Sequence, residues 1–154
     1  MTVIATDMTQ AEWEVMRVIW TLGELGSNDI IKAVQEKREW TESTIKTLLR
    51  RLVKRGALST STVGRKFIYH PEIAERVAME ATSTALFDHL CAMKKGGVLA
   101  NLVKETELSQ ADIRQLQALL TTKAKNAPEQ VACDCLGPNR EQDCTCSQEA
   151  SYND

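Results

Sequence analysis

Hydrophobic positions recur at helical spacing in three successive segments near the start of the chain. Over residues 9–22 they cover more than half of a helical wheel, which predicts a buried helix. Gly23 and Gly26 are expected to end it, and Ser27 is the expected N-cap of a second helix that runs to about Arg38. The pattern therefore opens with two short helices joined by a glycine-containing turn.

The third segment, residues 41–56, carries two interleaved stripes. One stripe is apolar and follows the i, i+3, i+4, i+7 spacing of a helix that packs on a core. The other stripe carries hydroxyl and cationic side chains. After Gly56, a run rich in Thr, Ile and aromatic residues predicts two short strands that turn near Val63 and Gly64.

Three further helical segments follow the strands. The stretch from Pro71 to the Gly96-Gly97 pair predicts one long helix, with a break at the glycines. Beyond the break lie residues 98–105 and a helix over 109–125, which starts with a Ser-Gln-Ala-Asp capping box. These three helices are too few to cover one another's apolar faces within one chain, so we expect the chain to self-associate.

Composition narrows the class of protein. The chain has 154 residues, of which 43% are hydrophobic and 26% charged, as in a small globular protein. No apolar run approaches the ~18 residues of a membrane span, and the N-terminus lacks the features of a signal peptide, so we expect a cytoplasmic protein with no membrane partner. The sequence shows no nucleophile–base pair, paired carboxylates or phosphate loop, and therefore predicts no enzyme.

The net charge of −2 conceals an uneven distribution of charge. Residues 1–70 hold 11 basic and 8 acidic side chains, whereas residues 71–154 hold 8 basic and 13 acidic ones. Residues 41–66 contain seven basic residues and a single acid, Glu42. A local basic field in a mildly acidic chain indicates a surface that binds a polyanion.

Three helices followed by a two-stranded hairpin, with cations on the third helix and at the hairpin turn, form the layout of a winged helix-turn-helix. A helix fits the major groove of duplex DNA, and a basic hairpin can follow the phosphate backbone. For any single basic residue, a solvated surface role is the alternative. The expected DNA-contacting residues are Thr41, Ser43, Thr44, Lys46, Thr47, Arg50, Arg51, Arg65 and Lys66.

The expected fold class is mainly α, in three parts. A winged helix-turn-helix DNA-binding domain, with three helices and a two-stranded wing, is expected over residues 1–71. A helical dimerisation region is expected over residues 72–126, and a cysteine-rich, metal-binding tail over residues 127–154.

Four of the five cysteines form two Cys-x-Cys pairs in the tail: Cys133, Cys135, Cys144 and Cys146. In an extended segment the side chains of residues i and i+2 project to the same face, so each pair offers two sulfurs to one ion. Four thiolates suit Zn(II), and Cu(I) also prefers sulfur ligands. A disulfide framework is disfavoured in a cytoplasmic chain, whereas redox sensing stays open as an alternative.

The remaining cysteine and the histidines are expected to be structural. Cys91 falls among Phe87, Leu90 and Met93 on a predicted helix, where a small core residue is the favoured interpretation. His70 and His89 lie far upstream of the tail.

The segments "TQAEWEVMRVIWTLGE", "WTESTIKTLLRRLVKRGAL" and "GRKFIYHP", in this order over residues 9–71, resemble the bacterial CopY/BlaI/MecI family of winged-helix repressors. The resemblance implies a homodimer that binds a palindromic operator and represses transcription. The β-lactam branch of the family is inactivated by proteolysis in the dimerisation region, whereas the copper-responsive branch ends in a paired Cys-x-Cys tail that binds metal. The two pairs present here therefore imply the copper-responsive branch.

In that branch, Cu(I) would occupy the thiolate site, or displace Zn(II) from it, and so derepress copper-homeostasis genes; a copper chaperone is a further candidate partner. Copper-responsive members place four residues between the pairs, whereas this chain places eight, "LGPNREQD". Doubling a loop costs about 0.6 kcal/mol, against thiolate–zinc binding of order 10 kcal/mol, so the site is expected to survive. A repressor relieved by proteolysis or redox, with a structural zinc, and a copper or zinc storage or delivery protein remain alternatives.

Overall fold

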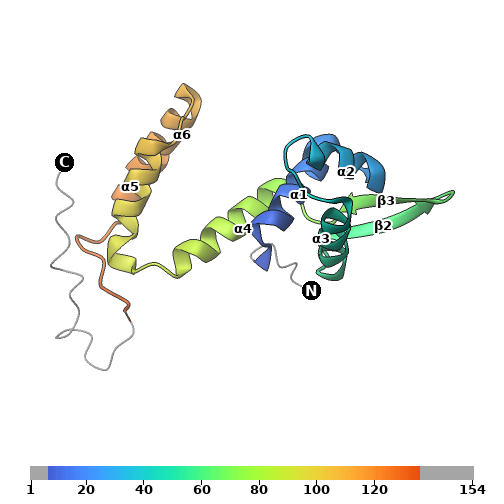
Figure 1. Cartoon of the computed structure of the whole chain (residues 1–154). Coiled ribbons are helices and arrows are strands. Elements are labelled where there is room, and N and C mark those ends of the chain that lie inside the picture. Colours follow the sequence, from blue (N-terminus) through green and yellow to red (C-terminus); the bar gives the residue numbers. More distant parts are fainter. Residues whose placement is uncertain (1–6, 136–154) are drawn as a thin grey trace. The chain divides into compact units, whose positions relative to one another are not determined.

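The computed structural model describes residues 7–135, and the chain divides into two compact units, 1–86 and 87–154 (Figure 1). From residue 7 onward, the first unit holds three helices, three short strands and most of a fourth helix: α1 (Gln10–Leu22), β1 (Leu25–Gly26), α2 (Ser27–Gln35), α3 (Glu42–Lys54), β2 (Leu58–Val63), β3 (Lys66–Pro71) and α4 (Glu75–Asp88). The described part of the second unit holds the 3-10 turn η2 (Ala92–Lys94), α5 (Lys95–Glu105) and α6 (Gln110–Ala124).

Helix α1 begins and ends where the sequence predicts. The Thr9 hydroxyl accepts a hydrogen bond from the Glu12 amide, and the Glu12 carboxylate accepts one from the Thr9 amide, which completes a capping box. Gly23 follows the helix with a φ of 86°, a conformation that glycine adopts without strain.

Helix α2 starts one residue earlier than its predicted cap implies. Gly26, not Ser27, is the N-cap, and Ser27 is the first helical residue. Gly26 has an extended backbone because it pairs with Ile68 in the sheet, so the change from strand to helix falls directly after it. The helix ends at Gln35, before Arg38, whose side chain instead pairs with Glu14.

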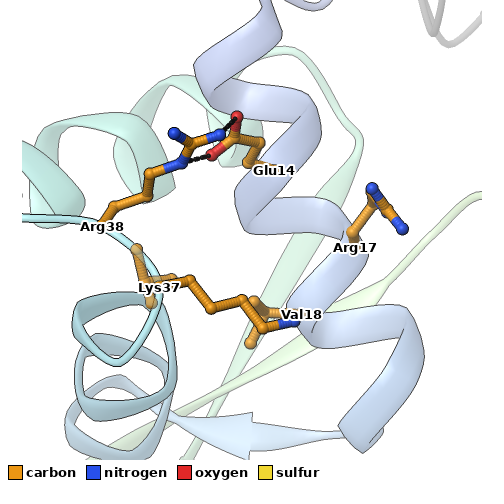
Figure 2. A pocket seen from close by; sticks show the side chains of 6 residues that line it. Glu14, Arg17, Val18, Lys37 and Arg38 are labelled. Carbon is orange, nitrogen blue, oxygen red and sulfur yellow. Dashed lines mark hydrogen bonds and ion pairs between the residues drawn. The ribbon is translucent and has the colours of Figure 1, made fainter.

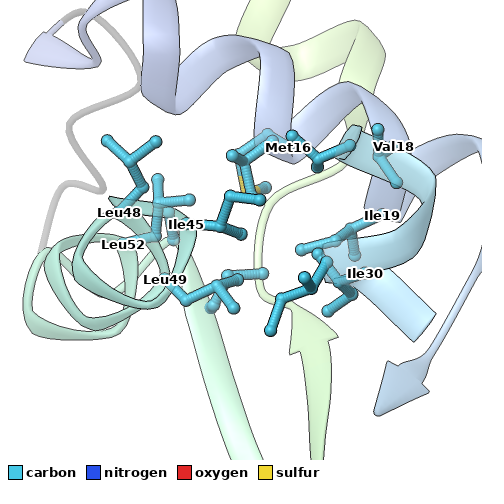
Figure 3. Packing of buried hydrophobic residues seen from close by; sticks show 13 residues of the cluster. Met16, Val18, Ile19, Ile30, Ile45, Leu48, Leu49 and Leu52 are labelled. Carbon is cyan, nitrogen blue, oxygen red and sulfur yellow. The ribbon is translucent and has the colours of Figure 1, made fainter. Parts of the chain in front are cut away.

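The core of the first unit lies between α1, α2 and α3, where apolar side chains from the three helices meet (Figure 3). Burial of each Leu or Ile contributes about 1.5–3 kcal/mol to folding. Thirteen buried residues form the cluster: Val15, Met16, Val18, Ile19, Ile30, Ile31, Val34, Ile45, Leu48, Leu49, Leu52, Ala57 and Leu58. The core thus fixes the orientation of α3.

The sheet is antiparallel with the strand order β1-β3-β2. The wing formed by β2 and β3 turns after Val63, which pairs with Lys66, and Gly64 takes a φ of 64° in the turn, as the sequence predicts. The short strand β1 escaped prediction because two residues are too few to show an alternating pattern. Three helices and a wing in this arrangement confirm the winged-helix fold.

The prediction of one long helix from Pro71 to the Gly96-Gly97 pair is wrong. Pro71 ends β3, opposite Leu58, and α4 begins at Glu75. The break falls after Asp88, and the two glycines lie in the first turn of α5. The amides of a first turn have no intrahelical partner, so glycine costs less there than in the middle of a helix.

Helices α5 and α6 leave their apolar side chains accessible. Neither helix contains a buried residue, and Leu102, Leu119 and Leu120 are 46%, 60% and 62% exposed. The predicted capping box of α6 is confirmed: Ser109 and Asp112 exchange hydrogen bonds between side chain and backbone. Within residues 7–135, no helix has the length and apolar character needed to cross a bilayer.

Candidate DNA-binding face and thiol cluster

The two stripes predicted for α3 are confirmed. Ile45, Leu48, Leu49 and Leu52 are buried in the core. On the polar stripe Ser43, Lys46, Arg50 and Lys54 are exposed and Thr47 is half-buried. The polar side chains line a shallow hollow on the outer surface of the helix: Glu42, Ser43, Lys46, Thr47 and Arg50. Packing of one stripe therefore presents the other, which holds four of the predicted DNA-contacting residues, to the solvent.

The hydroxyl groups at the start of α3 shape its first turn. Thr41 is the N-cap, and its Oγ1 accepts a hydrogen bond from the Thr44 amide at 3.2 Å. The hydroxyls of Thr41 and Thr44 lie 2.9 Å apart, and Thr47 donates to the Ser43 carbonyl at 2.9 Å. Thr41 thus stabilises the helix terminus in addition to its predicted role.

The cations of α3 are in different electrostatic settings. Lys46 forms an ion pair with Glu42 one turn earlier in the helix. Arg50 and Arg51 are exposed and make no ion pair within the described residues 7–135. Glu42, the single acid of this basic segment, thus already engages one of the cations that we expect to meet DNA.

The wing cations lie beside the start of α2. Arg65 and Lys66 follow the turn at Gly64 and line a shallow pocket together with the first turn of α2: Gly26, Ser27, Asn28, Asp29 and Phe67 complete its wall. No side chain accepts a hydrogen bond from the first amides of α2. The start of a helix carries partial positive charge, which favours an anion nearby. Ser27 and Asn28 were not predicted as neighbours of the wing, because their proximity depends on the pairing of β1 with β3.

Arg55 has a structural role, in contrast to its neighbours in the basic segment. Its Nε lies 3.7 Å from Oε1 of Glu12, whose side chain is fully buried, and its guanidinium donates a hydrogen bond to the Asp7 carbonyl. The pair joins the end of α3 to the start of α1. A buried carboxylate is costly without a cation nearby, so Arg55 stabilises the fold by pairing with Glu12.

A second polar pocket lies between α1 and the end of α2 (Figure 2). Arg38 donates two hydrogen bonds to the Glu14 carboxylate, at 2.7 and 2.6 Å, and these bonds and the negative charge raise the pKa of Arg38. The other lining residues are Arg17, Val18, Val34 and Lys37. This set contains no nucleophile and no acid–base pair, and its ion pair connects two elements of the fold.

Three cysteines meet in the second unit. Cys91 lies between α4 and η2, and Cys133 and Cys135 lie in the segment that follows α6. The Cys91 sulfur is 3.8 Å from that of Cys133 and 3.7 Å from that of Cys135, and all three sulfurs lie within 4.8 Å of one another. Cys144 and Cys146, the second predicted pair, are outside the described residues.

The placement of Cys91 differs from the sequence prediction. It is not on a helix and is partly exposed, so it is not a core residue. The prediction failed because the helical pattern of residues 71–95 was taken as continuous, whereas the chain turns after Asp88. The spacing of the other cysteines gave no signal that Cys91, 42 residues earlier than Cys133, would lie beside Cys133 and Cys135.

Backbone hydrogen bonds support the cluster from two sides. The Ala92 amide donates to Oδ1 of Asp134 at 2.8 Å, and the Cys135 amide donates to the sulfur of Cys133 at 3.3 Å. The first bond holds the residue between the two tail cysteines against the backbone next to Cys91. The second fixes the Cys133 sulfur next to the backbone of Cys135.

The fold and the exposed basic face define a winged-helix protein of the DNA-binding class. The sequence profile described as "Penicillinase repressor" matches residues 8–122. The chain is 33% identical over 113 residues to the penicillinase repressor of Bacillus licheniformis, covering 73% of this chain and 88% of the relative. It is also 31% identical over 117 residues to the methicillin resistance regulatory protein MecI of Mammaliicoccus sciuri, covering 76% and 95%.

A stronger match is an uncharacterized 16.5 kDa protein of Latilactobacillus sakei, 54% identical over 143 residues, covering 93% of this chain and 95% of the relative. Among solved structures, the DNA-binding domain of the repressor BlaI is 39% identical, with a TM-score of 0.45, and covers 48% of this chain and 90% of that one. The CopR repressor structure is 48% identical, with a TM-score of 0.39, over 44% and 97%.

The chain belongs to the penicillinase repressor family, which confirms the predicted membership of the CopY/BlaI/MecI group. It is therefore a DNA-binding transcriptional repressor and not an enzyme.

Proposed function

We propose that this repressor responds to copper. As a cytoplasmic homodimer, it would hold a palindromic operator in its apo or zinc form and release it when Cu(I) occupies the thiolate site or displaces Zn(II). Copper-homeostasis genes would then be derepressed. The observation that carries the proposal is that the sulfurs of Cys133 and Cys135 lie within 4.8 Å of each other, in a chain of a repressor family.

The chemistry of the donor atoms fits this ion class. The only group of three or more potential metal ligands within residues 7–135 consists of cysteines alone. Soft thiolates select Cu(I) and also bind Zn(II), whereas Mg(II) and Ca(II) prefer oxygen. The predicted tail ligands are Cys133, Cys135, Cys144 and Cys146, of which the structure describes the first two.

The exposed stripe of α3 supports the proposed contacts with DNA. Ser43, Lys46, Thr47 and Arg50 lie together on one face, which would enter the major groove with Thr41, Thr44 and Arg51 nearby. Arg65 and Lys66 on the wing would contact phosphates. Arg55 is not part of the proposed interface because it pairs with the buried Glu12.

The exposed apolar residues of the helical region support a homodimer. Between residues 75 and 124 of a single chain, Ala78 is the only buried residue. The large apolar side chains left accessible there are Val77, Met79, Leu86, Val98, Leu99, Leu102, Val103, Ile113, Leu119 and Leu120. A second copy of the chain would bury them and would match the twofold symmetry of a palindromic operator.

Release requires that Cu(I) bind the DNA-free conformation more tightly than the DNA-bound one. A coupling free energy of ~1.5–3 kcal/mol changes operator affinity by tenfold or more. The test is to titrate Cu(I) into the protein–operator complex under anaerobic conditions, with Zn(II) as the control ion, and to follow release by fluorescence anisotropy. Undiminished operator affinity at stoichiometric Cu(I) contradicts the proposal.

Delivery of the ion by a copper chaperone remains a prediction.

The similarity to the penicillinase repressor favours a second candidate, a repressor that is relieved by proteolysis or redox and in which a zinc ion in the tail is structural. The double variant Cys133→Ser/Cys135→Ser separates the two. Loss of the copper response with operator binding retained supports metal sensing, whereas loss of folding supports a structural zinc.

A further inference from the structure

Cys91 occupies a position that neither the tail motif nor the DNA-binding face explains. It directly precedes η2, and the chain on both sides of it is helical: α4 ends at Asp88 and η2 leads into α5. The two other thiols of the cluster, Cys133 and Cys135, belong to the segment that follows α6 in the sequence. The fold therefore brings together a cysteine of the helical region and the first Cys-x-Cys pair of the tail.

The separations between the sulfurs match those of a thiolate metal site. Ligands placed tetrahedrally at ~2.3 Å from a zinc ion lie about 3.8 Å from one another. The distances from Cys91 to Cys133 and Cys135 are 3.8 and 3.7 Å. Disulfide-bonded sulfurs lie about 2.05 Å apart, so these separations do not correspond to disulfide bonds from Cys91 to either residue.

The surroundings of the cluster hold the tail in place beside Cys91. The bond from the Ala92 amide to Asp134 fixes the residue between Cys133 and Cys135. The bond from the Cys135 amide to the Cys133 sulfur orients that sulfur. Partners of this type position the ligands of metal sites.

We propose that Cys91 is a metal ligand, and that Cys91, Cys133 and Cys135 together bind a thiophilic d10 cation, Zn(II) or Cu(I). The inference deepens the proposed function and rests on it, because it assigns a ligand outside the tail to the same thiolate site. A bond from the ion to Cys91 would also connect the tail directly to the residue that precedes η2 and α5. Metal binding in the tail would then constrain the start of these helices.

The first experiment uses the unaltered full-length chain, reduced and free of metal. Cysteine alkylation is followed by mass spectrometry of peptides, with and without one equivalent of Zn(II). Zn(II) is expected to slow alkylation of Cys91 together with Cys133 and Cys135. If Cys91 reacts at the same rate with and without Zn(II) while the tail cysteines are protected, the inference is wrong.

The second experiment compares Cys91→Ala with the neighbouring control Ala92→Ser, which leaves every thiol and the backbone amide of residue 92 in place. Alanine keeps the small apolar character of Cys91, so a packing role would survive the first change. For Cys91→Ala we expect Zn(II) affinity to fall by at least about 100-fold, beyond the ~10–100-fold typical of losing a group that only supports a ligand. The thiolate-to-Co(II) absorption of the Co(II)-loaded variant should also lose about a quarter to a third of its intensity, as expected when one of four or three sulfurs is removed.

Operator binding by the metal-free forms checks that Cys91→Ala still folds. Zn(II) affinity and Co(II) absorption within about twofold of the unaltered chain would overturn the assignment of Cys91 and, if Cu(I) still releases the operator, leave the proposed function standing. Failure of the unaltered chain to bind Zn(II) or Cu(I) through thiolates would overturn both.

Discussion

Glu42 and Lys46 form an ion pair on the proposed DNA-binding face. The ammonium group of Lys46 already pairs with Glu42, so on binding DNA Lys46 would have to exchange this carboxylate for a phosphate. An exposed pair of this kind is weak, typically ~0.2–1 kcal/mol, and a phosphate readily replaces the carboxylate.

We therefore expect Lys46→Ala to weaken binding to all duplexes and to reduce the slope of log K against log salt by about 0.9, the loss of one phosphate contact. Glu42→Gln should strengthen binding, by less than about fivefold. Filter binding or anisotropy across a salt series measures both. Lys123→Ala on α6 is the control of equal charge change, and an unchanged slope in Lys46→Ala would remove Lys46 from the interface.

Glu12 is a buried carboxylate that contacts both the N-cap of α1 and Arg55. One carboxylate oxygen accepts the Thr9 amide, and the other faces Arg55 without a hydrogen-bond partner. Glu12→Ala removes the capping bond and leaves Arg55 without its buried partner. We expect the free energy of unfolding to fall by about 1–3 kcal/mol.

Urea unfolding followed by tryptophan fluorescence measures this loss, since Trp13 and Trp20 stack edge to face on the same helix. Glu12→Gln, which keeps an oxygen for the Thr9 amide, is expected to lose less. Equal stability of Glu12→Ala and the unaltered chain would show that the capping box and the Arg55 pair contribute nothing.

At the scale of elements, hydrophobic periodicity predicted the first three helices, because each buries one face in a single local core. The wing was predicted from its strand-favouring residue types and its glycine turn. Hydrophobic periodicity failed for α4 and α5. Those helices bury almost nothing within the chain, so their pattern carries little information on where they end. The thiol cluster shows the same limit: the Cys-x-Cys pair is local and was recognised, whereas Cys91 joins it only through the path of the backbone.

The cap of α6 makes its stability depend on pH. The Ser109 hydroxyl and, to a smaller extent, its amide hydrogen-bond to the Asp112 carboxylate and lower the pKa of Asp112. A lowered pKa in the folded state means a contribution that is present above the ordinary pKa of ~3.9 and is lost as the pH falls through the lowered value.

In Ser109→Ala the pKa of Asp112 should rise toward its ordinary value, and the stability of α6 should depend less on pH in the acid range. Carboxyl chemical shifts in an NMR titration give the pKa directly, with Glu107, just before the helix, as the internal reference. An Asp112 pKa that is the same in both proteins would show that the Ser109 hydroxyl is not its cause.

At the scale of the whole molecule, the exposed apolar side chains of α5 and α6 predict that assembly can be disrupted without damage to the winged helix. Leu102→Asp places a charge where a partner chain is proposed to pack. We expect monomers in analytical ultracentrifugation and a loss of affinity for the full palindrome, with binding to a half-site retained.

Asn101→Asp introduces the same charge at the adjacent exposed position and serves as the control. An unchanged dimer in Leu102→Asp, or dissociation of both variants alike, would place the dimer contact elsewhere.

Cys91 and Cys133 are 42 residues apart in the sequence. This separation affects the stability of the helical region independently of the ligand chemistry of the cluster. An ion bound to both would close a loop that contains the whole of α5 and α6. Cross-linking a loop of this length removes unfolded-chain entropy worth about 4 kcal/mol if the ion stays bound on unfolding. The ion would then cross-link the two ends of this segment reversibly, and metal availability would change the stability of these two helices as well as the proposed occupancy of the operator.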